Sequence, residues 1–382
     1  MRTTRVLLVL LLGVVLSLGG FFLVRRGASE TAADPARVEV FLDGARRCLD
    51  EQIPHLCMNE LVLSTVPTLG IPSVMAGIAR ASEEYPQAFL EQCHRAAHYL
   101  GEYAGETIPD VDAALAIGTP FCQFGYYHGV MEGYARVTPT LFEELPDLCI
   151  RVDNNITSTA YAECSHALGH AIVTRTENDV AEGIEYCRRL ETRDERKACA
   201  TGIFMSWSNK LDDAIHARDR DGTEIPEKFL IAPIDRRWEQ CPALDVEMAE
   251  ACVHFLAETS PSQPVVGEVA VRQMREFTDW CESVFADRPS VALACHGAVG
   301  RVSGADAVFA PIGGWPGVVA FCTTAGYKEA VDICLTYAYT AGAQFDAAIV
   351  ENACRAWDGR PEQDEQCEQI RDLHDKAVAP VG

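Results

Sequence analysis

Residues 277–300 read FTDWCESVFADRPSVALACHGAVG, and this stretch contains the unit that decides the fold. Cys281 lies late in one helical segment, a short polar turn follows, and Cys295 begins a second segment of apolar and small residues. A disulfide between the two cysteines would join the segments into a helix hairpin. Such a bridge typically contributes ~2–4 kcal/mol to stability, because it restricts the unfolded chain.

The same pattern recurs along the 382-residue chain, whose 16 cysteines include no C-x-x-C motif. Helix–turn–helix units that recur every ~35–50 residues are typical of stacked α-helical repeats. We therefore predict an all-α fold of disulfide-stapled helix hairpins that form a solenoid or a closed α/α ring. Sequence alone does not fix disulfide connectivity, and consecutive pairing is the simplest arrangement. The predicted pairs are Cys48 with Cys57, Cys93 with Cys122, Cys149 with Cys164, Cys187 with Cys199, Cys241 with Cys252, Cys281 with Cys295, Cys322 with Cys334, and Cys354 with Cys367.

The N-terminus carries an apolar run, Val6 to Val24, between arginines on either side. A run of about 19 residues spans roughly 28 Å as a helix, close to the ~30 Å hydrocarbon thickness of a bilayer. A cleaved signal peptide usually has a shorter core and a clean A-x-A site. We therefore predict a transmembrane anchor, or an uncleaved signal, at residues 1–26.

A linker at 27–40 and a cysteine-rich helical domain at 41–382 are expected to follow the anchor. This domain divides into a histidine-rich part at 85–215 and C-terminal hairpins at 237–382. Disulfides persist in oxidising compartments, so the domain is expected on the periplasmic or extracellular side of a cell membrane that the chain crosses once. With Lys+Arg 32 against Asp+Glu 56, the net charge of −24 argues against nucleic acid as a partner.

Five of the ten histidines have His or Glu four residues later, which is more than chance spacing predicts. Residues four apart lie on one face of a helix, where two side chains can bind one metal ion. If the hairpins stack in sequence, stripes from successive helices converge on an interior pocket. The candidate metal ligands are His94, His98, Glu102, His128, Glu132, His166 and His170. Imidazole and carboxylate ligands suit zinc, iron, manganese or copper.

Motifs of other chemistries are missing: there is no G-x-S-x-G elbow, no phosphate-binding glycine loop and no H-E-x-x-H helix. No catalytic residue can be assigned, and whether the chain is an enzyme stays open. The first hypothesis is a metal-binding protein, as an oxidoreductase or a hydrolase. The second is a scaffold that binds a protein or peptide on a concave face and uses its histidines structurally. A b-type haem protein with two axial histidines ranks below both.

Overall fold

The computed structural model describes residues 32–343 except 52, 120, 153–158, 230, 257–267, 309–313 and 326. The predicted anchor at 1–26 lies outside the described residues. Within the described part of the chain every regular element is a helix, which confirms the all-α prediction. No helix in that part is both long and apolar enough to cross a membrane.

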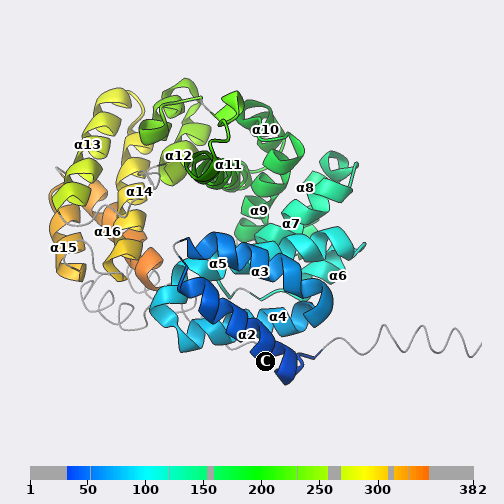
Figure 1. The fold of residues 1–382 in the computed structure, drawn as a ribbon. Helices are drawn as coiled ribbons and strands as arrows, with labels where there is room; N and C mark the ends of the chain where they lie inside the picture. The colour runs from blue at the N-terminus through cyan, green and yellow to red at the C-terminus, as the bar shows by residue number, and fades with distance from the viewer. Residues whose placement is uncertain are drawn as a thin grey trace, which may run out of the picture.

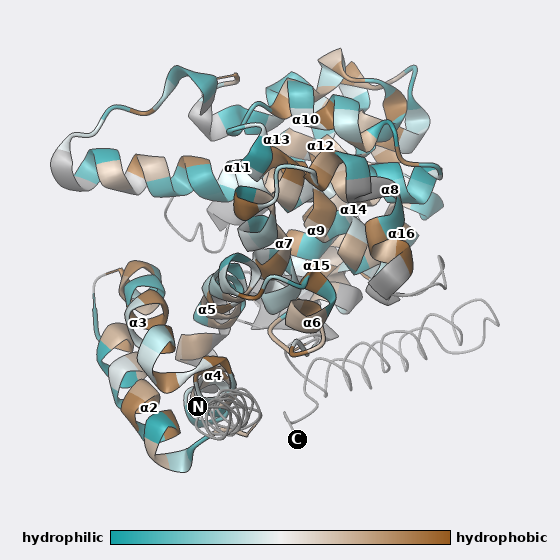
Figure 2. Cartoon of the chain, turned by 90° about the vertical axis from the view of Figure 1, so that its right-hand side faces the viewer, coloured by the Kyte–Doolittle hydropathy of each residue, from teal (hydrophilic) through white to brown (hydrophobic). Residues whose placement is uncertain are grey.

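Four helices form a bundle at the N-terminal end of the described chain. They are α2 (Pro35–Leu49), α3 (Pro54–Leu69), α4 (Ile71–Glu84) and α5 (Pro86–Thr107). Each has proline in its first turn, where the missing N–H costs no intrahelical hydrogen bond. Figure 2 shows α2, α3 and α4 as a group set apart from the rest, and α5 packs against α3, α4 and the next long helix, α7.

From α5 onward, long helices follow one another in a curved row (Figure 1). Each packs against the next in chain order. After α5 the row comprises α7 (Gly125–Val137), α9 (Thr159–Arg175), α11 (Arg193–Asp221), α12 (Val246–Leu256), α14 (Pro289–Val308) and α16 (Lys328–Ala343). The other helices pack beside this row or lie between its members in the chain: α6 (Val111–Leu115), α8 (Leu141–Val152), α10 (Val180–Cys187), η1 (Glu227–Phe229), η2 (Ile234–Ala243), α13 (Glu268–Val284) and α15 (Gly314–Cys322).

Disulfides join neighbouring segments of the chain, as the cysteine spacing predicts. Cys281 of α13 bonds to Cys295 of α14, so the hairpin at residues 277–300 forms as expected. All seven pairs within the described residues are consecutive, and no described cysteine is free. The other six bonds join Cys48 to Cys57, Cys93 to Cys122, Cys149 to Cys164, Cys187 to Cys199, Cys241 to Cys252, and Cys322 to Cys334.

The eighth predicted pair is not tested by the structure. Both of its members, Cys354 and Cys367, lie outside the described residues. The bond between them therefore stays a prediction, whereas the other 14 of the 16 cysteines are accounted for by the seven described disulfides.

Glycines at the helix crossings let the long helices approach one another more closely than residues with side chains would allow. A Cβ atom on Gly129 of α7 would lie 1.8 Å from the backbone oxygen of His98 in α5. Helices α9 and α11 make the same kind of contact at Gly202, where a Cβ atom would lie 1.9 Å from the backbone oxygen of His166. Real Cβ contacts are never this short, so only glycine fits at these crossings. The backbones are therefore in direct contact, which places the histidine stripes of neighbouring helices side by side.

Candidate metal centre

Five histidines from three helices meet in the interior: His94 and His98 of α5, His128 of α7, and His166 and His170 of α9. We call this group the histidine cluster. The ring of His128 lies 4.9 Å from the rings of both His166 and His170, centroid to centroid. The ring of His94 lies 5.2 Å from that of His128, and the ring of His98 lies 5.5 Å from that of His170.

Two carboxylates complete the group predicted from the sequence. Glu132 of α7 is buried and contacts both His98 and His170, whereas Glu102 of α5 contacts His98 at the edge of the cluster. The structure thus brings all seven predicted residues together. Their convergence is a geometric result, and it leaves open whether they bind metal.

Burial keeps four of the five histidines neutral, namely His94, His128, His166 and His170. Desolvation lowers the pKa of His170 to about 3, although its hydrogen bond to Glu132 opposes the shift. Burial also lowers the pKa of His94, His128 and His166, and neighbouring imidazoles depress it further. A neutral imidazole has one N–H and one nitrogen with a free lone pair. The question is therefore which nitrogen of each ring carries the lone pair.

The partners of the Nδ1 atoms answer this for two of the neutral rings. The Nδ1 of His94 donates to the backbone oxygen of Cys122 at 3.1 Å, and that of His170 donates to Glu132 Oε1 at 2.9 Å. Carbonyl and carboxylate oxygens accept hydrogen bonds only. Each of these Nδ1 atoms therefore carries the proton, and the Nε2 of each ring is left with its lone pair. The Nδ1 of His98 likewise donates to Glu102 Oε1 at 3.2 Å, and its Nε2 lies 3.6 Å from Glu132 Oε1.

His166 has the same arrangement. Its Nδ1 lies 2.9 Å from the hydroxyl oxygen of Thr201, and this hydroxyl donates to the backbone oxygen of Ala198 at 2.6 Å. The hydroxyl oxygen thus accepts from His166, whose Nε2 keeps the lone pair. That Nε2 lies 3.2 Å from the Nε2 of His170 and 3.3 Å from the sulfur of Met205. Two imidazole lone pairs face each other at hydrogen-bond distance with no proton between them.

His128 is the least satisfied member of the cluster. Only 3 % of it is exposed, and neither ring nitrogen has a hydrogen-bond partner. Glu163 Oε2 lies 3.5 Å from its Nε2, an ion-pair distance without hydrogen-bond geometry. The Nε2 of His94 is likewise buried and unpaired. A buried polar atom without a partner costs ~1–3 kcal/mol, so a polar cluster of this kind requires an explanation.

Two overlapping sets have the spacing of metal ligands. The potential ligand atoms of His128, His166 and His170 all lie within 4.8 Å of one another, and so do those of His98, Glu132 and His170. Two ligands of one ion can be at most about 4.2 Å apart, since each bond is ~2.1 Å long. Both sets are therefore within about 0.6 Å of the spacing that one ion requires.

The charge of Glu132 is balanced from outside the cluster. Lys210 Nζ lies 3.7 Å from its Oε2, and Arg136 lies 3.6 Å from the same oxygen. Ser206 donates to its Oε1 at 3.2 Å. Burial opposes ionisation, but Lys210 and the facing histidines outweigh it, and the pKa of Glu132 lies well below its usual range. Glu132 is thus an ionised acceptor that fixes the orientation of the His170 ring.

A small cavity of about 60 Å³ borders the cluster, and its lining includes His94, His98, Glu102, Glu132 and Lys210. A water molecule needs a site of ~10–15 Å³ by this kind of measure, so the cavity has room for a few waters.

The His94 ring contacts a strained turn, because its Nδ1 donates to the backbone oxygen of Cys122. Residues 122–124 all have positive φ, which non-glycine residues rarely adopt and which tends to occur at functional sites.

Several contacts of the cluster were not predicted. Thr201, Met205, Ser206 and Lys210 come from α11, and Glu163 comes from α9. The α11 residues form two pairs four positions apart, the same spacing that marks the histidine stripes. Threonine, methionine and serine are common in helices for other reasons, so this spacing alone would not have singled them out.

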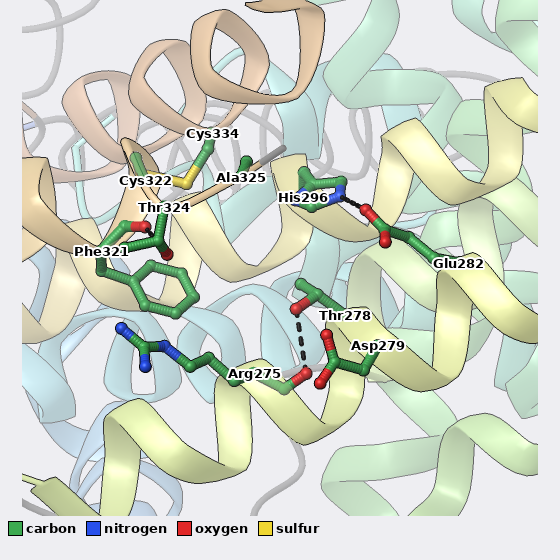
Figure 3. A pocket seen from close by; sticks show the side chains of 10 residues that line it. All are labelled: Arg275, Thr278, Asp279, Glu282, His296, Phe321, Cys322, Thr324, Ala325 and Cys334. Carbon is green, nitrogen blue, oxygen red and sulfur yellow. Dashed lines mark hydrogen bonds and ion pairs between the residues drawn. A yellow bond between two sulfur atoms is a disulfide. The ribbon is translucent and has the colours of Figure 1, made fainter. Parts of the chain in front are cut away.

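The remaining described histidines lie elsewhere. The sequence offered no carboxylate at helical spacing from His296, but Glu282 of α13 lies 3.0 Å from its Nε2, beside the disulfide between Cys281 and Cys295. Figure 3 shows this pair at one side of a cavity of about 290 Å³, with Arg275 at the other side. Like His170 with Glu132, the pair joins a buried histidine to a carboxylate of another helix, but through Nε2 instead of Nδ1 and outside the histidine cluster, which makes it a useful control.

No family model matches the chain, and no curated protein or solved structure matches it either. The fold and the cluster define the chain as an all-helical, disulfide-linked protein with a buried group of histidines. Its disulfides indicate an oxidising, extracytoplasmic environment.

Proposed function

We propose that this chain is an extracytoplasmic helical-repeat protein that binds a transition-metal ion in the histidine cluster, with His128, His166 and His170 as the principal ligands. The observation that carries the proposal is the orientation of the rings. Four of the five histidines hydrogen-bond outward through Nδ1, and in the neutral rings of His94, His166 and His170 this leaves Nε2 lone pairs inside the cluster. Metal-binding histidines almost always donate their other N–H to a carbonyl, carboxylate or similar acceptor in this way.

The short distance between His166 and His170 supports the same proposal. Their Nε2 atoms are 3.2 Å apart. Two nitrogens bonded at ~2.0–2.1 Å to one tetrahedral ion are about 3.3–3.4 Å apart. An ion between them would turn the repulsion of two lone pairs into two coordinate bonds. It would also give the unpaired His128 a partner.

The remaining residues have supporting roles in this proposal. Glu132 would orient His170, and Thr201 would orient His166. In the second set, which comprises His98, Glu132 and His170, the first two residues line the 60 Å³ cavity. An ion would reach the interior through this cavity. The ion would supply Lewis-acid or redox chemistry. The size of the cavity would limit any reactant to a few atoms, which fits an oxidoreductase or hydrolase acting on a very small molecule.

The scaffold hypothesis accounts for the outward hydrogen bonds, because they hold helices in register. It offers no hydrogen-bond partner for either nitrogen of His128, both of which are buried. The metal hypothesis gives one of these nitrogens a bond to the ion. Attachment to a membrane through residues 1–26, and a location on its outer side, remain parts of the proposal that follow from the apolar run and the disulfides.

A metal titration of the full chain tests the proposal. Zn²⁺ is added to metal-free protein in competition with a chromophoric chelator, for the wild type, His170→Ala and His296→Ala. The control variant removes a buried histidine with a carboxylate partner but lies outside the cluster. We expect His170→Ala to lower the affinity for Zn²⁺ by more than about 100-fold, because loss of a ligand costs more than loss of a ligand's hydrogen-bond partner. His296→Ala is expected to leave the affinity unchanged.

Two results would contradict the proposal. One is a wild-type chain that binds no metal and whose stability does not respond to chelators. The other is a His170→Ala variant that keeps its circular dichroism spectrum and binds as well as His296→Ala. The spectrum separates a lost site from a lost fold.

A further inference from the structure

Met205 gives the cluster a donor of a different kind. It lies on α11 four residues after Thr201, and the two side chains contact the two nitrogens of one ring. Thr201 contacts the Nδ1 of His166, and the sulfur of Met205 lies 3.3 Å from its Nε2. The position of α11 therefore fixes both contacts at once.

The contact between sulfur and nitrogen is not explained by a hydrogen bond in the tautomer derived above. The proton of His166 is on Nδ1, because the hydroxyl of Thr201 uses its own proton for Ala198. A thioether has no proton to give. The lone pairs of the Met205 sulfur and of the His166 Nε2 therefore face each other, in the same way as those of His166 and His170. Two electron-pair donors, the Met205 sulfur and the His170 Nε2, thus lie within 3.3 Å of the Nε2 of His166.

We infer that Met205 is a metal ligand and that the cluster is a copper site that favours Cu(I), with three imidazoles and one thioether as donors. This inference rests on the metal-binding function proposed above. Thioether sulfur is a soft donor that favours Cu(I), and imidazole is common to copper and zinc sites. Thiolates do not compete for this role, since every cysteine in the described part of the chain is in a disulfide.

The distances agree with coordination by both atoms. Nitrogen and sulfur bonded to one tetrahedral ion, at ~2.0 Å and ~2.3 Å, are about 3.5 Å apart. The observed distance between the two atoms is 3.3 Å, and a small rotation of the Met205 side chain would bring it to this value. Met205 is unbranched and has three rotatable bonds, which makes such an adjustment inexpensive.

The charges near the cluster also favour a monovalent ion. All four proposed ligands are neutral. Three carboxylates lie near the rings. Glu132 and Glu102 are matched by Lys210 and Arg136, which lie 3.7 Å from Glu132 and 2.6 Å from Glu102 respectively. Glu163, whose Oε2 lies 3.5 Å from the Nε2 of His128, contributes one further negative charge. The cost of burying an ion rises with the square of its charge, so a site with little net negative charge discriminates against divalent ions.

The test compares Cu(I) and Zn²⁺ in one set of proteins. Cu(I) is supplied with ascorbate, which leaves the disulfides intact, and bicinchoninate serves as the competing chelator. Met205→Leu removes the sulfur at nearly constant volume. Met248→Leu is the matched control, because Met248 is fully buried in α12 and belongs to no candidate ligand set.

We expect Met205→Leu to lower the affinity for Cu(I) by at least about tenfold and to change the affinity for Zn²⁺ by less than about threefold. Met248→Leu is expected to change neither. X-ray absorption at the copper edge should show a sulfur neighbour at ~2.3 Å in the wild type that is absent in Met205→Leu.

The outcomes separate the two levels of the proposal. If Zn²⁺ binds but Met205→Leu holds Cu(I) as tightly as Met248→Leu does, the inference about Met205 and copper is wrong and the metal site stands. If neither ion binds to the wild type, the proposed function itself fails.

Discussion

The close contact of α9 and α11 allows a quantitative test of how the fold positions the site. In Gly202→Ala the new Cβ atom would meet the backbone oxygen of His166 at 1.9 Å. This oxygen belongs to the helix backbone and cannot rotate away. An ordinary contact requires about 3.4 Å, so α11 must move from α9 by about 1.5 Å. Overpacking of this kind costs ~1–3 kcal/mol, and the better helix propensity of alanine returns up to ~1 kcal/mol.

The same displacement acts on the cluster. Thr201 is the neighbour of Gly202, and its hydroxyl oxygen lies 2.9 Å from the Nδ1 of His166. A movement of about 1.5 Å breaks this hydrogen bond, because a donor and acceptor more than ~3.5 Å apart do not form one. Loss of an outer partner of a metal-binding histidine typically lowers metal affinity by about 10–100-fold. We expect this loss in Gly202→Ala together with the loss of stability.

Gly300→Ala is the matched control. Its Cβ atom would lie 2.0 Å from the backbone oxygen of Cys334, in the contact between α14 and α16 away from the cluster. Urea unfolding with disulfides intact measures stability, and the chelator competition measures metal affinity. Both variants should lose ~1–2 kcal/mol, and only Gly202→Ala should lose affinity. An unchanged stability of Gly202→Ala, or an equal loss of affinity in Gly300→Ala, would refute the reasoning.

Two further predictions concern charge and protonation. Glu132→Gln keeps an oxygen that accepts from His170 but removes the charge, and we expect metal affinity in the chelator assay to fall by about 10–100-fold. The control is Glu282→Gln, which changes the carboxylate partner of His296 and should have no effect on metal affinity. Burial lowers the pKa of His254 well below its usual value, so the unfolded chain takes up a proton near pH 6.5 that the folded chain does not. The metal-free protein should therefore lose stability as the pH falls below ~6.5, by up to ~1.4 kcal/mol per pH unit for each such histidine. Urea unfolding between pH 7 and 5 should show a shallower slope for His254→Gln, and an identical slope would contradict this assignment.

The sequence was sufficient to predict the hairpins once consecutive cysteines were assumed to pair, because a disulfide requires its two segments to lie side by side. Cys281 and Cys295 flank a short polar turn, and a disulfide requires their Cα atoms to be close; the structure has them 6.4 Å apart. The grouping of the seven candidate residues could also be predicted, since spacing of four places His94 and His98, or His166 and His170, on one helix face. Their role as metal ligands stays a prediction.

Contacts between helices were harder to predict. The pairing of His296 with Glu282 depends on how α13 packs against α14, and no spacing within one helix reveals it. Thr201 and Met205 reach the cluster only because Gly202 lets α11 approach α9. The tautomer of each histidine depends on its acceptor, such as the backbone oxygen of Cys122, which is set by a turn of unusual backbone conformation. Sequence patterns identify which residues share a helix face, whereas the chemistry of the site depends on the distances between side chains of different helices.

The lone pairs inside the histidine cluster bind one metal ion if the proposed function is right. Anomalous X-ray diffraction from crystals of the metal-loaded full chain, recorded at the absorption edge of the added metal, locates such an ion directly. We predict a strong peak within bonding distance, ~2.0–2.1 Å, of ring nitrogens of His128, His166 and His170. A metal-loaded crystal with no peak in the cluster, or with its ion bound only at surface carboxylates, would contradict this prediction.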